Sequence, residues 1–166
     1  VIKGVFGSPW VGLEYFERFL SSPDFLTYLL NTLKLSVYGL LWGFPIPIIL
    51  ALVLNQIRRT GIRKKIQLLI YAPNFISVIV LCGMVRMFLS PVGPINSLLG
   101  INTNWMTMPS AFRTIYIASS IWQTAGWSSI MYTAALSNVS TDLEEAAIID
   151  GANILQRIRY VQLPAI

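Results

Sequence analysis

The 166-residue chain contains no histidine and one cysteine, Cys82, which lies inside an apolar run. A disulfide framework needs paired cysteines and a zinc site needs several cysteine or histidine ligands, so neither can form within this chain. The missing histidine also excludes a serine–histidine triad. No GxxxxGK[ST] phosphate loop is present. We therefore expect no catalytic residue and no metal ligand here.

Charge is also scarce, at 11% of residues, whereas a soluble domain carries about 25%. Hydrophobic residues make up 55% of the chain instead. Three runs, centred on residues 35–54, 66–85 and 115–136, are near the roughly 20 residues that cross a bilayer. Lipid offers no partner for unpaired backbone groups, so each run must be helical. The sequence predicts an all-α integral membrane protein, a polytopic helical bundle, with kinks at Pro45, Pro47 and Pro73.

Basic residues set the orientation of these helices. Five of them crowd the connector after the first run, which should therefore be cytoplasmic: Arg58, Arg59, Arg63, Lys64 and Lys65. Topology explains the net charge of +5, so we expect no nucleic acid partner. In chain order we predict an extracytoplasmic lead-in (1–25), a transmembrane helix (26–55), a basic cytoplasmic loop (56–65), a transmembrane helix (66–89), an extracytoplasmic loop (90–112), a transmembrane helix (113–137) and a cytoplasmic loop (138–166).

The last loop carries the clearest local signals in the chain. Thr141 and Glu144 have the spacing of a capping box at a helix start. Gly151 ends that helix, because glycine takes the positive φ that a helix end commonly needs. Residues 153–162 have the apolar spacing of a second helix, which Pro164 limits. The prediction is a helix, a sharp turn and another helix.

The same loop resembles the cytoplasmic EAA loop of permease subunits in binding-protein-dependent ABC importers. The resemblance rests on Glu145-Ala146-Ala147, then Asp150-Gly151-Ala152, then Leu163-Pro164. Ile158 and Val161 depart from the aromatic residue and the isoleucine of the family pattern but stay apolar. The stretches Asn31-Thr32-Leu33 and Phe88-Leu89-Ser90-Pro91 are similar to the carbohydrate branch of that family, the lipoprotein-like and polysaccharide permeases.

The resemblance implies a permease subunit for a sugar or oligosaccharide, not an enzyme, in the bacterial plasma (inner) membrane as a multi-pass protein. It implies a core of about six transmembrane helices, of which this chain, expected to be an internal piece, holds the second to fourth. The expected partners are two cytoplasmic ATP-binding subunits, a second permease forming a heterodimer, and an extracytoplasmic solute-binding protein. The chain itself would hold no cofactor, since the ATPase binds ATP and Mg. The predicted ATPase-coupling residues are Glu145, Ala146, Ala147, Asp150, Gly151, Ala152, Leu163 and Pro164.

The third run is unusually polar for lipid, which leaves two interpretations. Its polar residues can hold helices together, and small residues such as Gly126 then allow close packing. Alternatively they line the substrate path, for which we select Trp122, Gln123 and Trp127, together with Asn31 of the carbohydrate motif. Two other functions stay open at this point: a permease for another solute, such as peptide or phosphate, and a membrane-embedded enzyme.

Overall fold

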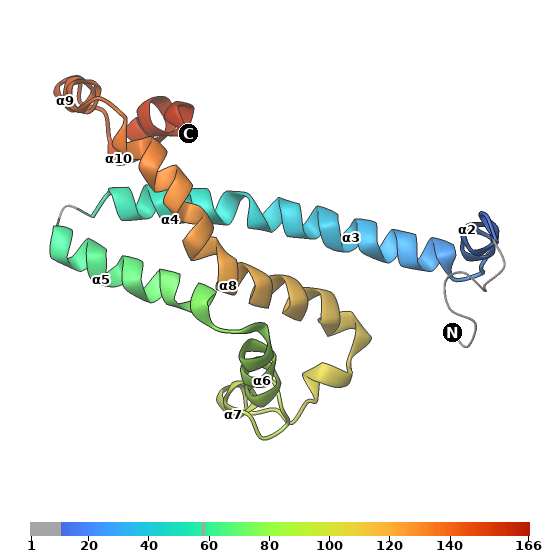
Figure 1. Ribbon diagram of the computed structural model, residues 1–166. Helices are drawn as coiled ribbons and strands as arrows, with labels where there is room; N and C mark the ends of the chain where they lie inside the picture. Colours follow the sequence, from blue (N-terminus) through green and yellow to red (C-terminus); the bar gives the residue numbers. More distant parts are fainter. Residues whose placement is uncertain (1–10, 58) are drawn as a thin grey trace. The chain divides into compact units, whose positions relative to one another are not determined.

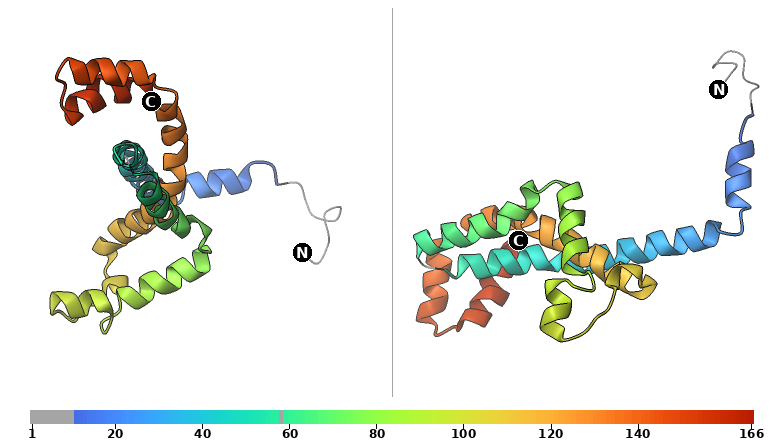
Figure 2. Two further views of the ribbon diagram at one scale, coloured as in Figure 1. Left: turned by 90° about the vertical axis from the view of Figure 1, so that its left-hand side faces the viewer. Right: turned by 90° about the horizontal axis from the view of Figure 1, so that it is seen from below.

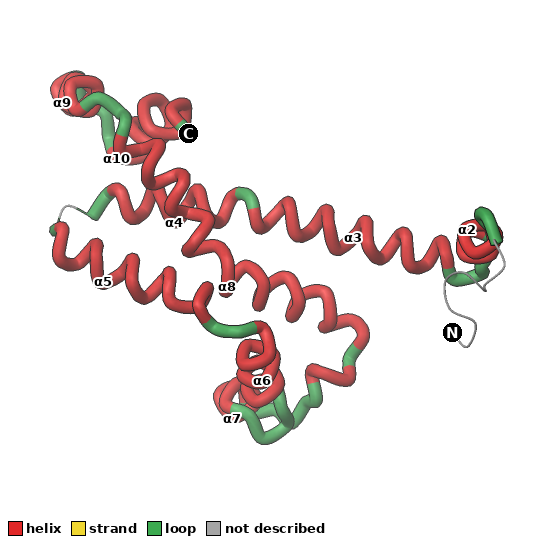
Figure 3. Tube along the Cα trace, viewed as in Figure 1, coloured by secondary structure: helices red, strands yellow, loops and turns green. Residues whose placement is uncertain are grey.

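The computed structural model of the chain describes residues 11–57 and 59–166. The first residues of the predicted lead-in and Arg58 lie outside that range. The described residues form helices joined by loops, without a strand among them, as Figure 3 shows. This confirms the predicted all-α class. The chain divides into two compact units, residues 1–37 and 38–166, and each is described by itself.

The first unit contains α2 (Glu14–Leu20) and the first part of α3 (Phe25–Gly43). No residue of α2 is buried. An exposed ion pair joins Arg18 to Glu14 at 3.2 Å. The rings of Phe19 and Phe25 meet edge to face, with their centroids 5.3 Å apart. The predicted lead-in thus contains a short, exposed helix.

The second unit is built around the packing of α8 (Pro109–Ser137) against α4 (Pro45–Asn55), which cross in Figures 1 and 2. Ala51, Leu52 and Leu136 form its buried core. Partly buried side chains close around that core from α4, α8 and the last loop: Ile48, Tyr132, Val139, Ile158 and Ile166. The final segment of the chain is therefore packed onto the same ends of α4 and α8 that the core occupies.

One continuous helical stretch, Phe25–Asn55, is 31 residues long and apolar enough to cross a membrane. It corresponds to the predicted helix at 26–55. Pro45 is the first residue of α4. A proline is tolerated there because an N–H group at the first helical position has no partner within the helix. Phe44 keeps helical dihedrals, φ −80° and ψ −51°, so the interruption between α3 and α4 is local.

The second predicted membrane helix is not one helix. Thr60–Phe75 and Val78–Phe88 are long and apolar enough to cross a membrane only when they are taken together, and the chain bends by 102° between them. The prediction of a single kinked helix over 66–89 is therefore wrong. α5 (Thr60–Tyr71) runs into a short 3₁₀ turn around Pro73, and α6 (Val78–Phe88) starts afresh with the Ser77 hydroxyl as its cap. A proline and a new capping residue four positions later end one helix and begin another.

The basic loop predicted at 56–65 is also shorter than expected. α5 begins at Thr60, so Arg63, Lys64 and Lys65 lie on a helix. Their sequence contains no proline or glycine to stop a helix after Gly61, and long basic side chains are good helix formers.

The third predicted membrane helix is α8, which starts at Pro109 instead of 113 and has 29 residues. Within the described part of the chain, α8 is long enough to cross a membrane, but its composition is not apolar enough. Its polar side chains account for this, as the sequence indicated. A helix of this kind needs neighbouring helices to cover its polar face.

The loop before α8 is more ordered than a string of turns. It contains α7 (Pro94–Leu99) and a buried asparagine, Asn96, which is 1% exposed. The Asn96 amide nitrogen donates to the carbonyl oxygens of Ser90 (3.0 Å) and Thr103 (2.6 Å). Its amide oxygen accepts from the Trp105 indole nitrogen at 2.7 Å. One side chain thereby fixes three points of this loop.

Candidate functional site

The last loop, predicted to be cytoplasmic, begins with α9 (Thr141–Ile149), and the cap of α9 is Ser140. The Ser140 hydroxyl accepts a hydrogen bond from the Asp142 amide at 3.2 Å. The predicted capping box of Thr141 and Glu144 is therefore wrong by one residue. Ser140 has non-helical dihedrals (φ −59°, ψ 132°) and a hydroxyl of its own, so it caps the helix first and leaves Thr141 inside it.

The sharp turn at Gly151 is present as predicted. Gly151 has φ +76°, and its amide donates to the Ile148 carbonyl at 3.0 Å. The next amide, of Ala152, donates to the Ala147 carbonyl at 2.9 Å. These two bonds form the Schellman motif, which satisfies the last carbonyls of a helix and requires the left-handed conformation at the glycine.

The second helix of the loop starts with a capping box at Asn153 and Gln156. The Asn153 amide donates to Gln156 Oε1 at 2.8 Å, and the Gln156 amide donates to Asn153 Oδ1 at 2.9 Å. The helix continues through α10 (Ile154–Arg157), a π turn at Ile158–Gln162 and a 3₁₀ turn at Leu163–Ala165. The predicted helix at 153–162 is thus confirmed, with an irregular second half.

A polar network holds the two helices of the loop together. Glu144 accepts from Arg157 Nη1 at 3.2 Å through one carboxylate oxygen and from Gln162 Nε2 through the other. Gln162, which is 2% exposed, accepts in turn from Gln56 Nε2 at 2.8 Å. Gln56 is the C-cap residue that directly follows α4. The network therefore links the first helix of the loop to the second, and the second to a helix of the bundle.

The predicted coupling residues lie together on this two-helix loop. α9 buries none of its residues, and Glu145 and Asp150 are exposed. Large apolar side chains are exposed beside them, namely Leu143, Ile148, Ile149, Ile154 and Leu155. Pro164 and Leu163 lie exposed at the far end. The loop is a fixed shape that presents apolar and acidic side chains outward.

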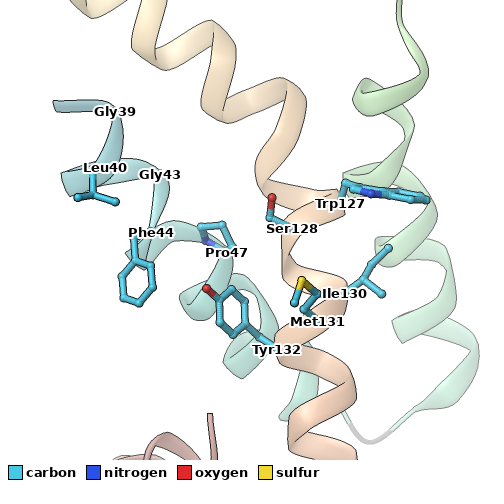
Figure 4. Close-up of a pocket in the computed structure, with 10 residues that line it drawn as sticks. All are labelled: Gly39, Leu40, Gly43, Phe44, Pro47, Trp127, Ser128, Ile130, Met131 and Tyr132. Atoms are coloured by element: carbon cyan, nitrogen blue, oxygen red, sulfur yellow. The ribbon is translucent and has the colours of Figure 1, made fainter. Parts of the chain in front are cut away.

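A hollow of about 590 Å³ lies between α8 and the junction of α3 with α4. Figure 4 shows Ser128 and Tyr132 of α8 on the side of Phe44 and Pro47, whereas the ring of Trp127, which also borders the hollow, points away from Phe44 and Pro47. Trp127 meets Phe75 edge to face, with the ring centroids 5.7 Å apart. The hollow has the size of a small-molecule site.

The other predicted path residues have different surroundings. Gln123 Nε2 donates to the Ile76 carbonyl at 2.9 Å, at the break between α5 and α6. Trp122 lines a second groove with Tyr38, Trp42 and Arg113. Asn31 is exposed on the part of α3 that belongs to the first unit. Trp127 thus borders the hollow while its ring packs on Phe75, and Gln123 has a partner in the backbone.

Sequence reasoning missed the role of Glu144, Arg157, Gln162 and Gln56. The sequence predicts only a capping role for Glu144, and the two glutamines carry no local signal. Gln56 and Gln162 are 106 positions apart, and no local spacing rule connects such residues. Opposite charges on Glu144 and Arg157, in a loop predicted to fold back on itself, were the one available hint.

These features define a helical protein with one helical stretch apolar enough to cross a membrane and with an exposed, internally hydrogen-bonded two-helix loop. The model of the family described as the inner membrane component of binding-protein-dependent transport systems matches residues 43–166. The chain belongs to that family.

Two curated relatives are similar over 98% of this chain. Protein LplB of Bacillus subtilis strain 168 is 39% identical over 168 residues, which are 53% of LplB. The polygalacturonan/rhamnogalacturonan transport system permease protein YteP of the same strain is 41% identical, and the match covers 52% of YteP. The chain thus spans about half the length of the curated relatives it matches.

Solved structures agree with this assignment. A bacterial ABC transporter involved in the import of the acidic polysaccharide alginate matches with a TM-score of 0.90 and 40% identity, over 99% of this chain and 59% of that one. The alginate transporter in complex with an alginate pentasaccharide-bound periplasmic protein matches with a TM-score of 0.88 and 41% identity, over 93% of this chain and 56% of that one.

Proposed function

We propose that the chain is part of a permease subunit that imports a sugar or oligosaccharide, driven by a separate ATPase that docks on residues 141–164. The observation that carries the proposal is the shape of this loop. It is capped at both helix starts and turned sharply at Gly151, and α9 buries none of its side chains within the chain. The names of YteP and of the alginate transporter support a saccharide as the solute.

Docking follows from what the loop exposes. Ile149 is 85% exposed and Leu143 is 59% exposed, beside the carboxylate of Glu145. An exposed apolar patch with a polar rim is the usual mark of a protein-binding surface. In our proposal the apolar side chains fill a cleft of the ATPase, Glu145 contacts polar groups at its edge, and Gly151 permits close approach.

The energy for transport comes from the partner in this proposal. Two ATP-binding subunits bind ATP with Mg and close around it, and α9 moves with the cleft in which it is seated. The permease chain binds no cofactor and performs no hydrolysis. Because α9 is part of a stiff loop packed on α4 and α8, its displacement reaches the bundle and changes the side from which the path is open.

The substrate path is proposed to pass the hollow beside Trp127. Its volume of about 590 Å³ falls in the range of small-molecule sites. Hydroxyl groups of Ser128 and Tyr132 line it, and aromatic surfaces such as Phe44 suit the apolar faces of sugar rings. We propose Trp122, Gln123 and Asn31 as further path residues in the complete bundle.

The remaining partners are inferred from the family. A second, different permease subunit completes the bundle in the bacterial inner membrane, which the protein crosses several times. A solute-binding protein delivers the saccharide to the extracytoplasmic side, as supported by the periplasmic protein bound to the alginate transporter.

The test uses the full-length permease complex in proteoliposomes, with its solute-binding protein on one side and ATP on the other. ATP hydrolysis is measured with a panel of saccharides, peptides and phosphate. We expect stimulation by a saccharide-loaded binding protein. Stimulation by peptide or phosphate alone would refute the saccharide assignment, and an absence of any ATPase partner would refute the importer assignment.

A glycine pair makes the coupling test specific. Gly151 and Gly100 both have positive φ, +76° and +65°, and an added Cβ meets nothing within 4 Å at either position. Gly151→Trp and Gly100→Trp therefore impose similar backbone strain, but Gly100 ends α7 in the loop before α8. We expect Gly151→Trp to abolish stimulation and Gly100→Trp to keep it.

A further inference from the structure

The hydrogen bonds between Gln56, Gln162 and Glu144 have a direction that the carboxylate imposes. A carboxylate only accepts hydrogen bonds, so Gln162 must turn its amide nitrogen toward Glu144. Its amide oxygen then faces Gln56, which must donate, as it does at 2.8 Å. The three side chains form a relay in which each group can take one orientation only.

Burial makes this relay strong. Gln162 is 2% exposed, and the side chains of Glu144 and Arg157 are 23% and 13% exposed. Water therefore has little access to replace a lost bond, and a buried polar group without a partner is costly. Bonds to the charged end of the relay are stronger than bonds between neutral groups.

The position of the relay matters more than its strength. α9 follows α8 directly in the chain, through the short segment at Asn138–Ser140. With that link alone, a pull on α9 would act on α8 and rotate the loop about its attachment. The loop is also held by Ile158 and Ile166, which pack on the core of α4 and α8. The relay adds a polar attachment that starts on α9 itself and runs through Gln162 to Gln56 at the end of α4.

We propose that Gln162 is a positioning residue that transmits movement of α9 to α4, by joining Glu144 of the loop to Gln56 of the bundle. This inference rests on the proposed coupling to an ATPase. It adds that the helix pair α4 and α8 moves as a unit, because both members are tied to the loop. The apolar contacts of Ile158 and Ile166 with the core hold the second helix of the loop beside α4, where Gln162 reaches Gln56.

The experiment uses the full-length permease complex with its ATPase in proteoliposomes, and saccharide transported per ATP hydrolysed is the main readout. The amount of ATPase that copurifies with the permease reports assembly separately. Gln56→Leu removes the donor at the end of α4, whereas Gln56→Lys keeps a donor there. Gln67→Leu on α5 is the matched control, since none of the side-chain hydrogen bonds among described residues involves Gln67.

We expect the Gln56→Leu complex to assemble normally and to transport about tenfold less saccharide per ATP. Tenfold is about the change in an equilibrium that the loss of one hydrogen bond produces. Gln56→Lys and Gln67→Leu should stay close to the wild type. Equal efficiency of Gln56→Leu and the wild type would overturn the proposal. So would equal losses in Gln56→Leu and Gln56→Lys, because the donor would then not matter.

A second pair tests the direction of the relay. Gln162→Glu keeps the shape of the side chain but places a second carboxylate against Glu144, so coupling should fall. Exchanging the two groups, Glu144→Gln with Gln162→Glu, restores a donor facing an acceptor and keeps the total charge. We expect the exchange to recover most of the lost coupling. Coupling no better than that of Gln162→Glu alone would contradict the relay, and if Gln162→Glu fails to assemble, the Gln56 pair decides.

Failure of this inference differs from failure of the proposed function. If the importer assignment is wrong, the wild-type complex itself shows no saccharide transport. If only the relay is wrong, the wild type transports saccharide and the Gln56→Leu variant does so equally well.

Discussion

Among the described glycines, Gly126 leaves the least room for an added side chain, and it gives the sharpest stability prediction. A Cβ added at Gly126 would lie 2.1 Å from the Ile70 carbonyl oxygen and 2.7 Å from the carbonyl carbon. Real Cβ contacts are not that short, so Gly126→Ala must push α8 away from α5. A shift of roughly 1 Å removes a quarter to a half of the dispersion energy of each contact across that seam.

The expected cost combines two opposing effects. Overpacking a tight core costs about 1–3 kcal/mol, while alanine gains about 1 kcal/mol over glycine inside a helix. We expect a net loss of about 1–2 kcal/mol, because the clash involves backbone atoms that cannot rotate away. The unfolding midpoint of the full-length permease in detergent should fall by roughly 2–5 °C.

Two controls make this prediction refutable. Gly83 lies inside α6, and an added Cβ meets nothing within 4 Å there, so Gly83→Ala should keep or slightly raise the midpoint. Trimming the neighbour with Ile70→Ala should not rescue Gly126→Ala, since the closest atoms belong to the Ile70 backbone. Equal midpoints for Gly126→Ala and Gly83→Ala, or rescue by Ile70→Ala, would show that the close approach does not limit packing.

Three further substitutions test the polar contacts. Asn96→Leu leaves the Trp105 indole and two carbonyls without their partner. It should lower the free energy of unfolding of the purified permease, measured with denaturant, by about 1–3 kcal/mol. A smaller change than that of Ser97→Leu would contradict this. Gln123→Leu removes the donor to the Ile76 carbonyl, and proteolysis near residues 72–77 should become faster, whereas an unchanged cleavage rate would refute a bracing role. Asn153→Ala removes the cap of α10, costs about 1 kcal/mol and should weaken copurification of the ATPase; undiminished copurification would refute the need for that cap.

The two-helix loop at residues 141–164 was predictable because its signals are local. Gly151 marks the turn through its own backbone freedom, and Pro164 limits the second helix through its missing N–H. The error at the first cap was one residue, since Ser140 and Thr141 both carry a hydroxyl and the sequence alone does not rank them. Local chemistry thus placed the elements correctly and left the end residue open.

The break between α5 and α6 shows where local signals stop being sufficient. Pro73 predicted a kink, but a bend of 102° needs partners for the backbone groups that the break frees. Gln123 supplies one of them from a distant helix, and Phe75 gains Trp127 as an aromatic neighbour. Those contacts depend on the bundle being assembled, so the sequence could indicate the weak point and not the angle.

The same reasoning explains why the polar residues of α8 had two interpretations from sequence. Gln123 now has a backbone partner for its amide nitrogen, which favours packing at that position, while Ser128 and Tyr132 line the hollow beside Trp127. A single helix can serve both purposes because its faces differ: residues three to four apart share a face, and their neighbours do not.

Trp127→Ala separates the two roles. If the hollow carries the saccharide, the variant raises the KM for transport without lowering the unfolding midpoint as far as Gly126→Ala does; if Trp127 only braces Phe75, the midpoint falls and the KM stays unchanged.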